Sequence, residues 1–199
     1  MSKEPPERPL LRRDAIVDTA REMIRAGGLH GLSLRRLASQ LGVTAPALYA
    51  HVADKRDLLR AVAELEFDRL VSRFDAVTTA DPVERLRAYH HAYIDHAREN
   101  PELFEVMFVF APDVGASELP AGAELPAATK TFAIALAAVE DAIAAGAIDA
   151  TDPLLVSLTL WTAAHGVATA LRLGLELPDD YQDRLVDEVV DRLLRGWST

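Results

Sequence analysis

The sequence contains no cysteine, which excludes disulfide bonds, thiolate metal sites and cysteine nucleophiles. The lack of thiols is compatible with a reducing compartment, and we expect the protein to be cytoplasmic. The first residues, MSKEPPERPLLRR, lack the apolar core of a signal peptide, so they are expected to form a short disordered arm.

Positive charge is also scarce over the whole chain, because 21 Lys and Arg stand against 31 Asp and Glu for a net charge of −10. Taken as an average, this charge argues against nucleic-acid binding. Residues 1–60, however, carry 11 basic and 7 acidic side chains, whereas residues 61–199 carry 10 basic and 24 acidic ones. Half of the 199 residues are hydrophobic, which excludes a disordered or fibrous protein. The uneven charge predicts two parts, the first facing an anionic partner.

No segment alternates with period two for long enough to predict a strand, and helical signals occur throughout, so the fold class is predicted to be all-α. Gly27-Gly28 should end the first helix. Asp81-Pro82, Asn100-Pro101 and Asp152-Pro153 each pair a capping side chain with a proline that tolerates the first helical turn. The predicted helices are 12–27, 33–41, 44–51, 54–75, 81–99, 101–110, 126–146, 152–174 and 178–196. The stretch 111–126, rich in Pro and Gly, is expected to be a loop.

One long stretch, from Pro153 to Leu171, carries no formal charge over 19 residues and has to be tested as a membrane span. Small and polar residues interrupt it: Ser157, Thr159, Thr162, His165, Gly166 and Thr169. We therefore expect no membrane span, and instead a helix that protein buries on most sides.

Residues 31–59 predict two short helices joined by a tight turn at Gly42. Ser33 and Thr44 are suitable N-cap residues for these helices, and Pro46 fits the first turn of the second. This is the pattern of a helix-turn-helix, whose second helix enters the DNA major groove. A helical hairpin in an enzyme or an adaptor has the same pattern. Basic side chains surround this hairpin in an otherwise acidic protein and favour DNA: Arg35, Arg36, His51, Lys55 and Arg56.

The run LASQLGVTAPALYAHVADKRDLL (residues 37–59) closely resembles the DNA-reading segment of the TetR family of bacterial repressors. The preceding residues 12–33 match as well, so the resemblance covers about residues 10–70. It implies that Arg35 reads a base edge, that residues 44–47 face bases and that Tyr49, His51 and Lys55 hold phosphates. The implied DNA-contacting residues are Ser33, Arg35, Thr44, Ala45, Pro46, Ala47, Tyr49, His51 and Lys55. Ala45 and Ala47 stand where the tetracycline-responsive namesake has polar side chains, so its operator does not transfer.

Beyond residue 70 two shorter patterns, NPELFEVMF (100–108) and WTAAHG (161–166), resemble one branch of TetR-type C-terminal domains. This resemblance implies a ligand-sensing and dimerising unit. The predicted domains are therefore a helix-turn-helix domain at 10–70 and a C-terminal domain at 71–199, with their boundary inside the helix 54–75.

Small residues recur every four positions in the helix 152–174, which permits the close approach of a second helix, and the last helix has a wide apolar face. Two such helices from each subunit can form a four-helix interface in a homodimer. The alternative is that both helices complete the core of a monomer. The predicted interface residues are Thr162, Gly166, Ala170, Val186, Val189, Val190 and Leu193.

Aromatic, Met and His residues in the middle helices predict a largely apolar pocket for an unidentified small-molecule effector, although ordinary core packing produces the same pattern. The predicted pocket residues are Tyr89, Tyr93, Phe104, Met107, Phe108, Phe132, Trp161 and His165. His90, His91 and His96 do not supply the three convergent ligands that a metal needs. We expect them to be solvated surface histidines, and we expect no metal or other cofactor.

The sequence has no GxSxG, no Gly-rich phosphate loop and no HExxH, so no enzymatic activity is predicted. We expect a homodimeric, ligand-responsive regulator, most simply a repressor that a small molecule releases from a palindromic operator in double-stranded DNA. The sequence does not exclude direct activation. A helical-bundle enzyme, or an interaction module whose basic patch binds an acidic partner, remains the alternative.

Overall fold

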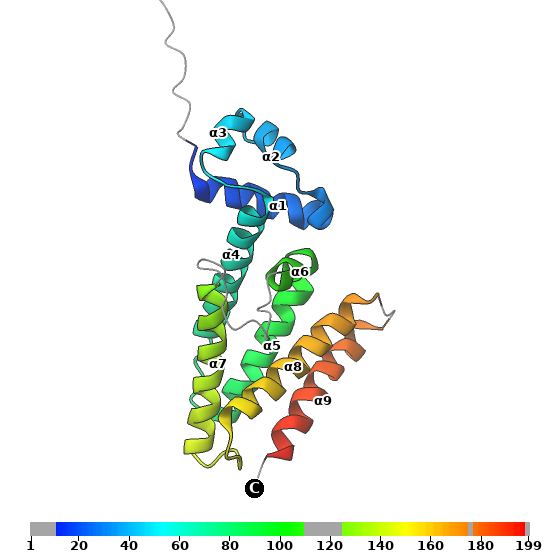
Figure 1. Ribbon diagram of the computed structural model, residues 1–199. Helices are drawn as coiled ribbons and strands as arrows, with labels where there is room; N and C mark the ends of the chain where they lie inside the picture. The colour runs from blue at the N-terminus through cyan, green and yellow to red at the C-terminus, as the bar shows by residue number, and fades with distance from the viewer. Residues whose placement is uncertain (1–10, 110–124, 175–176, 198–199) are drawn as a thin grey trace, which may run out of the picture.

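The computed structural model describes residues 11–109, 125–174 and 177–197, and within these ranges the regular structure is helical (Figure 1). The predicted N-terminal arm and most of the loop predicted over 111–126 lie outside the described residues. Every predicted helix is confirmed, with small differences at the ends. The helices are α1 Arg13–Gly31, α2 Leu34–Gln40, α3 Ala45–Tyr49, α4 Lys55–Asp75, α5 Pro82–Glu99, α6 Pro101–Val109, α7 Pro126–Ala144, α8 Pro153–Arg172 and α9 Asp179–Gly196.

The helix starts follow the capping chemistry of the sequence. The Asp81 carboxylate accepts hydrogen bonds from the first free N–H groups of α5, and Asp152 accepts one from the Leu155 N–H at the start of α8. At the predicted end of the first helix, Gly28 has a positive φ of 63° and the regular helix breaks. A further helical turn then continues to Gly31, so Gly27-Gly28 kinks α1 instead of ending it.

Helix α4 runs from beneath α1 down into the body of the molecule (Figure 1). It is buried on several sides because α1, α5, α6 and α7 all pack around it. The predicted domain boundary near residue 70 lies inside this helix. One buried apolar cluster includes Ile16 of α1, Phe67 of α4, Phe104 of α6 and Ala168 of α8. The core is therefore continuous from the head, a name used here for α1 to α3, into the C-terminal helices.

Helices α8 and α9 lie side by side on one flank of the body (Figure 1). Among the described residues, α8 is long and apolar enough to cross a membrane by length and composition, yet only 28% of its apolar window is buried. The expectation that protein buries this helix on most sides is wrong within the single chain. Large apolar side chains on its outer face are exposed, namely Leu154, Leu155, Leu158 and Trp161.

Candidate DNA-binding surface and ligand site

The two short helices of the head begin at capped positions. The Ser33 Oγ accepts the Arg36 N–H at 3.1 Å, and the Thr44 Oγ1 accepts the Ala47 N–H at 3.4 Å. Gly42, with a φ of 68°, makes the turn between α2 and α3 in the left-handed conformation that glycine adopts without strain. The two N-cap residues and the glycine turn of the helix-turn-helix are thus those expected from the sequence.

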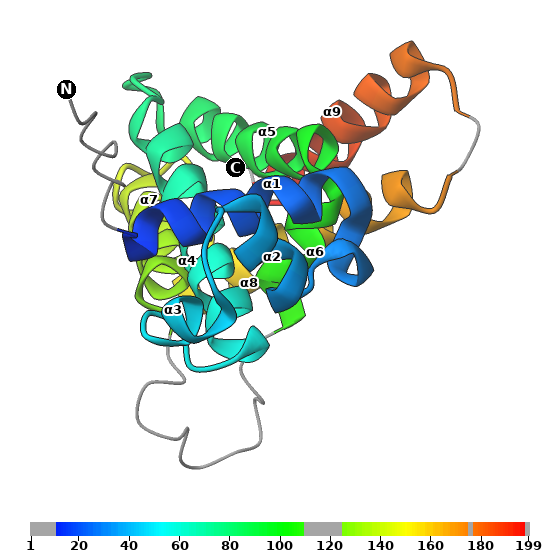
Figure 2. The same ribbon diagram turned by 90° about the horizontal axis from the view of Figure 1, so that it is seen from above.

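Helix α3 presents one side to solvent because Leu48, with 0% exposure, anchors its other side in the core. Tyr49 is 53% exposed, and the side chains before Leu48 are small and exposed: Thr44, Ala45, Pro46 and Ala47. Helices α2 and α3 occupy the end of the molecule that lies farthest from the C-terminus, and Figure 2 looks down onto this end. A surface of this shape lets the α3 backbone approach base edges closely; the individual base contacts stay a prediction.

An ion pair fixes the segment that follows α3. Arg13 Nη2 lies 2.6 Å from Asp57 Oδ1, and Arg13 also donates to the carbonyl of His51. The hydrogen bond from Arg13 holds the pKa of the Asp57 carboxyl below its ordinary value. The sequence had not singled out Arg13 or Asp57, yet they bind the backbone of His51 and Ala53, between α3 and α4.

The predicted DNA-contacting cations differ in their surroundings. Arg35 is exposed and makes no hydrogen bond or ion pair with the residues that the structure describes. Lys55 Nζ donates to the Leu29 carbonyl at 3.2 Å, and Arg36 donates to the Gly31 carbonyl at 3.2 Å. Lys55 therefore ties α4 to α1 while two of its three ammonium protons stay free for a phosphate.

Five predicted pocket residues gather where α5, α6 and α8 meet. The Tyr93 hydroxyl lies 2.9 Å from His165 Nδ1. The His165 ring lies 4.6 Å from that of Phe108 and 5.6 Å from that of Trp161, centroid to centroid, and Tyr93 packs edge-on against Phe104 at 5.6 Å. Burial raises the pKa of Tyr93 and lowers the pKa of His165, so both groups are neutral at pH 7. We call this group, with Phe67, the aromatic cluster.

The other three predicted pocket residues lie apart from the cluster. Tyr89 stacks on Phe74 at 4.4 Å, Met107 is 1% exposed in the apolar core, and Phe132 is half-buried on α7 without a ring contact to the described residues. Phe67 of α4 was missed by the sequence analysis and packs edge-on against Phe108 at 6.0 Å. Its position in the linking helix gave no sign that it faces the C-terminal helices.

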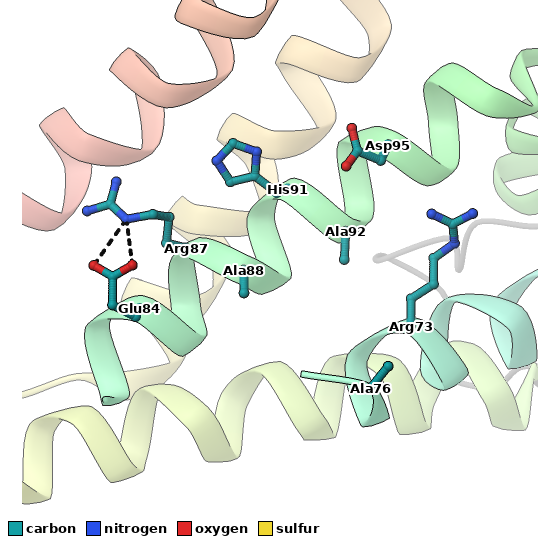
Figure 3. A pocket seen from close by; sticks show the side chains of 8 residues that line it. All are labelled: Arg73, Ala76, Glu84, Arg87, Ala88, His91, Ala92 and Asp95. Atoms are coloured by element: carbon teal, nitrogen blue, oxygen red, sulfur yellow. Dashed lines mark hydrogen bonds and ion pairs between the residues drawn. The ribbon is translucent and has the colours of Figure 1, made fainter. Parts of the chain in front are cut away.

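A hollow of about 430 Å³ lies between α4 and α5 (Figure 3). It is lined by Arg73, Ala76, Glu84, Arg87, Ala88, His91, Ala92 and Asp95. Arg73 pairs with Glu99, Arg87 contacts Glu84 at 3.4 Å, and His91 lies 3.1 Å from Asp187. Because its two arginines already have carboxylate partners, this hollow differs from the apolar pocket that was predicted.

Two of the three histidines on α5 were wrongly expected to be solvated. His90 is 5% exposed and His96 is 2% exposed, and burial lowers the pKa of each to about 4. Only His91 is partly exposed, beside Asp187. Helix α5 is enclosed by α4, α7 and α8, and the polar residues in its sequence gave no indication of this burial. In the part of the chain that the structure describes, no three potential metal ligands converge.

The predicted interface residues divide into two sets. Five are exposed or half-buried on α8 and α9: Thr162, Gly166, Ala170, Val189 and Leu193. Val186 and Val190 have exposures of 3% and 0%. Because α9 packs against α5 and α8, these two valines belong to the core of the chain, and their assignment to the interface is corrected.

Two family models match this arrangement of a head and a helical body. Residues 16–62 match the bacterial regulatory proteins of the tetR family, and residues 86–193, more than half of the chain, match the tetracyclin repressor-like C-terminal domain. The chain belongs to the TetR family. In this TetR-family protein the matched C-terminal residues include most of the aromatic cluster.

Two curated relatives show how the similarity is distributed. The tetracycline repressor protein class C of Escherichia coli is 52% identical over 54 residues, which are 27% of this chain and 25% of that repressor. The uncharacterised HTH-type transcriptional regulator Rv0681 of Mycobacterium tuberculosis is 27% identical over 189 residues, which are 94% of this chain and 81% of that protein. The identity to this tetracycline repressor thus spans only a quarter of that protein.

Solved structures share the whole fold of this TetR-family chain. A protein of unknown function from Rhodococcus sp. RHA1 has a TM-score of 0.83 at 27% identity and covers 99% of this chain and 100% of its own. The complex of AibR with isovaleryl coenzyme A and operator DNA has a TM-score of 0.66 at 22% identity, covering 92% and 98%. The second likeness is one of fold alone.

Proposed function

We propose that this TetR-family protein is a cytoplasmic, homodimeric repressor that binds a palindromic operator and releases it when a small molecule binds. The observation that carries this proposal is the exposed face of α3, with Leu48 buried behind it and small side chains in front. The segment that forms this face lies within residues 16–62, which match the model of the bacterial regulatory proteins of the tetR family. Arg35 of α2 is exposed, makes no hydrogen bond or ion pair with the described residues, and supplies a guanidinium for a base edge.

The homodimer is supported by the outer face of α8. Leu154, Leu158, Thr162 and Gly166 follow one another at four-residue spacing and are all exposed. A row of apolar and small residues on a helix surface favours close contact with another helix, and a second copy of the same chain covers it symmetrically. In such a dimer the two heads are set to bind half-sites about 34–36 Å apart.

The effector is proposed to bind at the aromatic cluster. Tyr93 and His165 are neutral there and supply a donor and an acceptor among apolar rings, which suits a largely apolar molecule with a hydrogen-bonding group. Helix α6 carries Phe104 and Phe108 of the cluster and also packs against α1 and α4. A ligand that favours one position of α6 therefore shifts the heads, provided that it binds the two states with different affinity. AibR, which has the same fold, holds both isovaleryl coenzyme A and operator DNA.

The proposal is tested by selecting duplexes from a random DNA pool on the purified protein and then titrating the selected duplex against salt. We expect an inverted repeat to be enriched, and binding to weaken steeply with salt because the protein replaces phosphate counterions. A scrambled duplex of the same composition is the control. Equal retention of both duplexes, or no enrichment, would favour the interaction-module or enzyme alternatives and overturn the repressor proposal.

A further inference from the structure

Glu66 is a fully buried carboxylate in the middle of α4, with 0% exposure. Its Oε1 accepts a hydrogen bond from Arg21 Nε of α1 at 2.5 Å, and Arg69 Nε of the next turn lies 3.6 Å away. Its Oε2 lies 3.5 Å from His96 Nε2 of α5. Burying an ion costs several kcal/mol unless it is well paired. The carboxylate of Glu66 therefore depends on these three contacts to offset the cost of its burial.

The side of Glu66 that faces α5 is incompletely satisfied. Glu66 Oε2 and His96 Nε2 are both buried, and neither has a hydrogen-bond partner among the described residues. At 3.5 Å the two atoms are at the outer limit of a hydrogen bond, whereas an approach of roughly 0.6 Å would give a charge-assisted bond of ordinary length. A small movement of α5 toward α4 would therefore satisfy both buried atoms, which are costly to leave without a partner.

The three residues span the junction between head and body. Arg21 lies on α1, which crosses the upper end of α4 (Figure 1), and its side chain is only 11% exposed. His96 lies on α5 one helical turn beyond Tyr93, which binds His165 of α8. The remaining charged groups around His96 are Arg69 and Arg73 on α4 and Glu99 on its own helix. One buried carboxylate thus contacts side chains of both α1 and α5.

We propose that Arg21, Glu66 and His96 form a coupling contact that transmits the position of the ligand-sensing helices to the DNA-binding head. Closing the gap between His96 and Glu66 draws α5 toward α4, and Arg21 carries the change to α1. His96 is a positioning residue, because it acts on the head through Glu66 and touches neither DNA nor the aromatic cluster. The DNA-based part of the test rests on the proposed function.

The first experiment compares His96→Leu with His90→Leu on the selected duplex. Both histidines are buried on α5, and both ring nitrogens of His90 and Nε2 of His96 have no hydrogen-bond partner among the described residues. Only His96 lies near Glu66, so His90→Leu is a matched control. We expect His96→Leu to change the Kd for the duplex about fivefold or more, in the range of an allosteric coupling, and His90→Leu to stay within about twofold of the parent, below a coupling of that size. His96→Gln keeps an N–H donor near the Nε2 position and should restore the parental Kd.

The second experiment measures the head without DNA. The natural chain has no cysteine, so two introduced cysteines, Ser39→Cys on α2 and Glu140→Cys on α7, are unique sites for spin labels at exposed positions. Dilution with unlabelled protein limits the measured distance to one chain. We expect the distance distribution to shift in His96→Leu and in Glu66→Gln, and to stay unchanged in His90→Leu.

The two readouts separate this inference from the proposed function. If no duplex is enriched, the operator proposal fails and the label distances still decide the coupling. A His96→Leu protein that matches the parent in distance and Kd overturns the coupling contact. Equal shifts in His96→Leu and His90→Leu also overturn it, because they would show a general effect of removing a buried histidine from α5.

Discussion

The hydroxyl of Tyr93 lies 2.9 Å from Nδ1 of His165, so a hydrogen bond joins α5 to α8 inside the aromatic cluster. Burial disfavours the ionised form of each group, raising the pKa of Tyr93 and lowering that of His165. The phenol can therefore donate to an unprotonated ring nitrogen at neutral pH. This bond and the hydrogen-bond interaction of Tyr93 with the Trp161 side chain are the polar elements of a cluster that otherwise consists of ring contacts.

Tyr93→Phe removes this hydroxyl and leaves His165 without its partner. We expect the free energy of unfolding to fall by about 1 kcal/mol, the usual net contribution of such a bond, as measured by urea denaturation. Tyr89→Phe is the control, because Tyr89 stacks on Phe74 and its hydroxyl makes no hydrogen bond to the described residues. Equal losses in the two variants would contradict a bond that contributes to stability.

His90 should make the protein less stable in mild acid. Burial lowers its pKa to about 4 in the folded chain, whereas the unfolded chain titrates near 6.5. The unfolded state therefore binds more protons between these values, and stability is complete above pH 6.5 and is lost as the pH falls toward 4. We expect the unfolding free energy to drop by roughly 2 kcal/mol more in the parent than in His90→Leu between pH 7.5 and 5. Parallel losses in both proteins would show that His90 is not the group responsible.

The fold was predictable because helix signals are local. Asp81 and Asp152 stand directly before prolines and do cap α5 and α8, and the turn at Gly42 follows from its neighbours. The sequence could not distinguish a kink at Gly27-Gly28 from a helix end, because a pair of glycines is compatible with both. Here α6 lies against that part of α1 and Glu102 approaches Gly28.

The site residues could be predicted where the family resemblance or an apolar pattern pointed to them. They could not be predicted where their role depends on which neighbouring helix buries them. The exposed face of α3 follows from the helix-turn-helix pattern. Glu66 and His96, by contrast, look like ordinary polar positions on amphipathic helices, and only the packing of α4 against α1 and α5 buries them. Val190 was misassigned for the same reason, since an apolar helix face does not reveal whether the neighbour is the same chain or a second one.

The Gly28 kink gives a test of the contact between α1 and α6. Gly28→Ala forces a residue with a Cβ into a φ of 63°, where that atom would also lie 2.9 Å from Glu102 Oε2. We expect a loss of about 1–3 kcal/mol in unfolding free energy, because a residue with a Cβ is strained when this φ is combined with a ψ of −172°. Gly27→Ala is the neighbouring control, because Gly27 has a negative φ and open space around its Cβ position. An equal loss in both variants would show that the positive φ of Gly28 is not the cause of the lost stability.

The outer face of α8 predicts how the subunits associate. Leu158→Glu places a charge in the exposed row, and Gly166→Glu adds a bulky charged side chain at its small-residue position. We expect both variants to sediment as monomers at concentrations where the parent is a dimer, because a charge buried in an apolar interface is strongly unfavourable. Ala137→Glu on the exposed side of α7 should leave the dimer intact. Unchanged sedimentation of Leu158→Glu would show that the dimer interface does not include this face of α8.

The last prediction separates base reading from phosphate binding in the head. Arg35 is exposed and unpaired among the described residues, so Arg35→Ala should weaken binding to the selected duplex and relax the preference at one base pair, at a cost of about 1–3 kcal/mol. Lys55→Ala should weaken binding to all duplexes to a similar degree and lower the salt slope by about 0.9, as expected for one lost phosphate contact.

These outcomes are measured by gel-shift titration of each variant against duplexes that carry single base changes, at several salt concentrations. Because Lys55 also donates to the Leu29 carbonyl, its variant must be shown to unfold at the same urea concentration as the parent, or its affinity corrected for the unfolded fraction. If Arg35→Ala weakens every duplex equally, Arg35 binds phosphate and the base-reading role belongs to the exposed residues of α3.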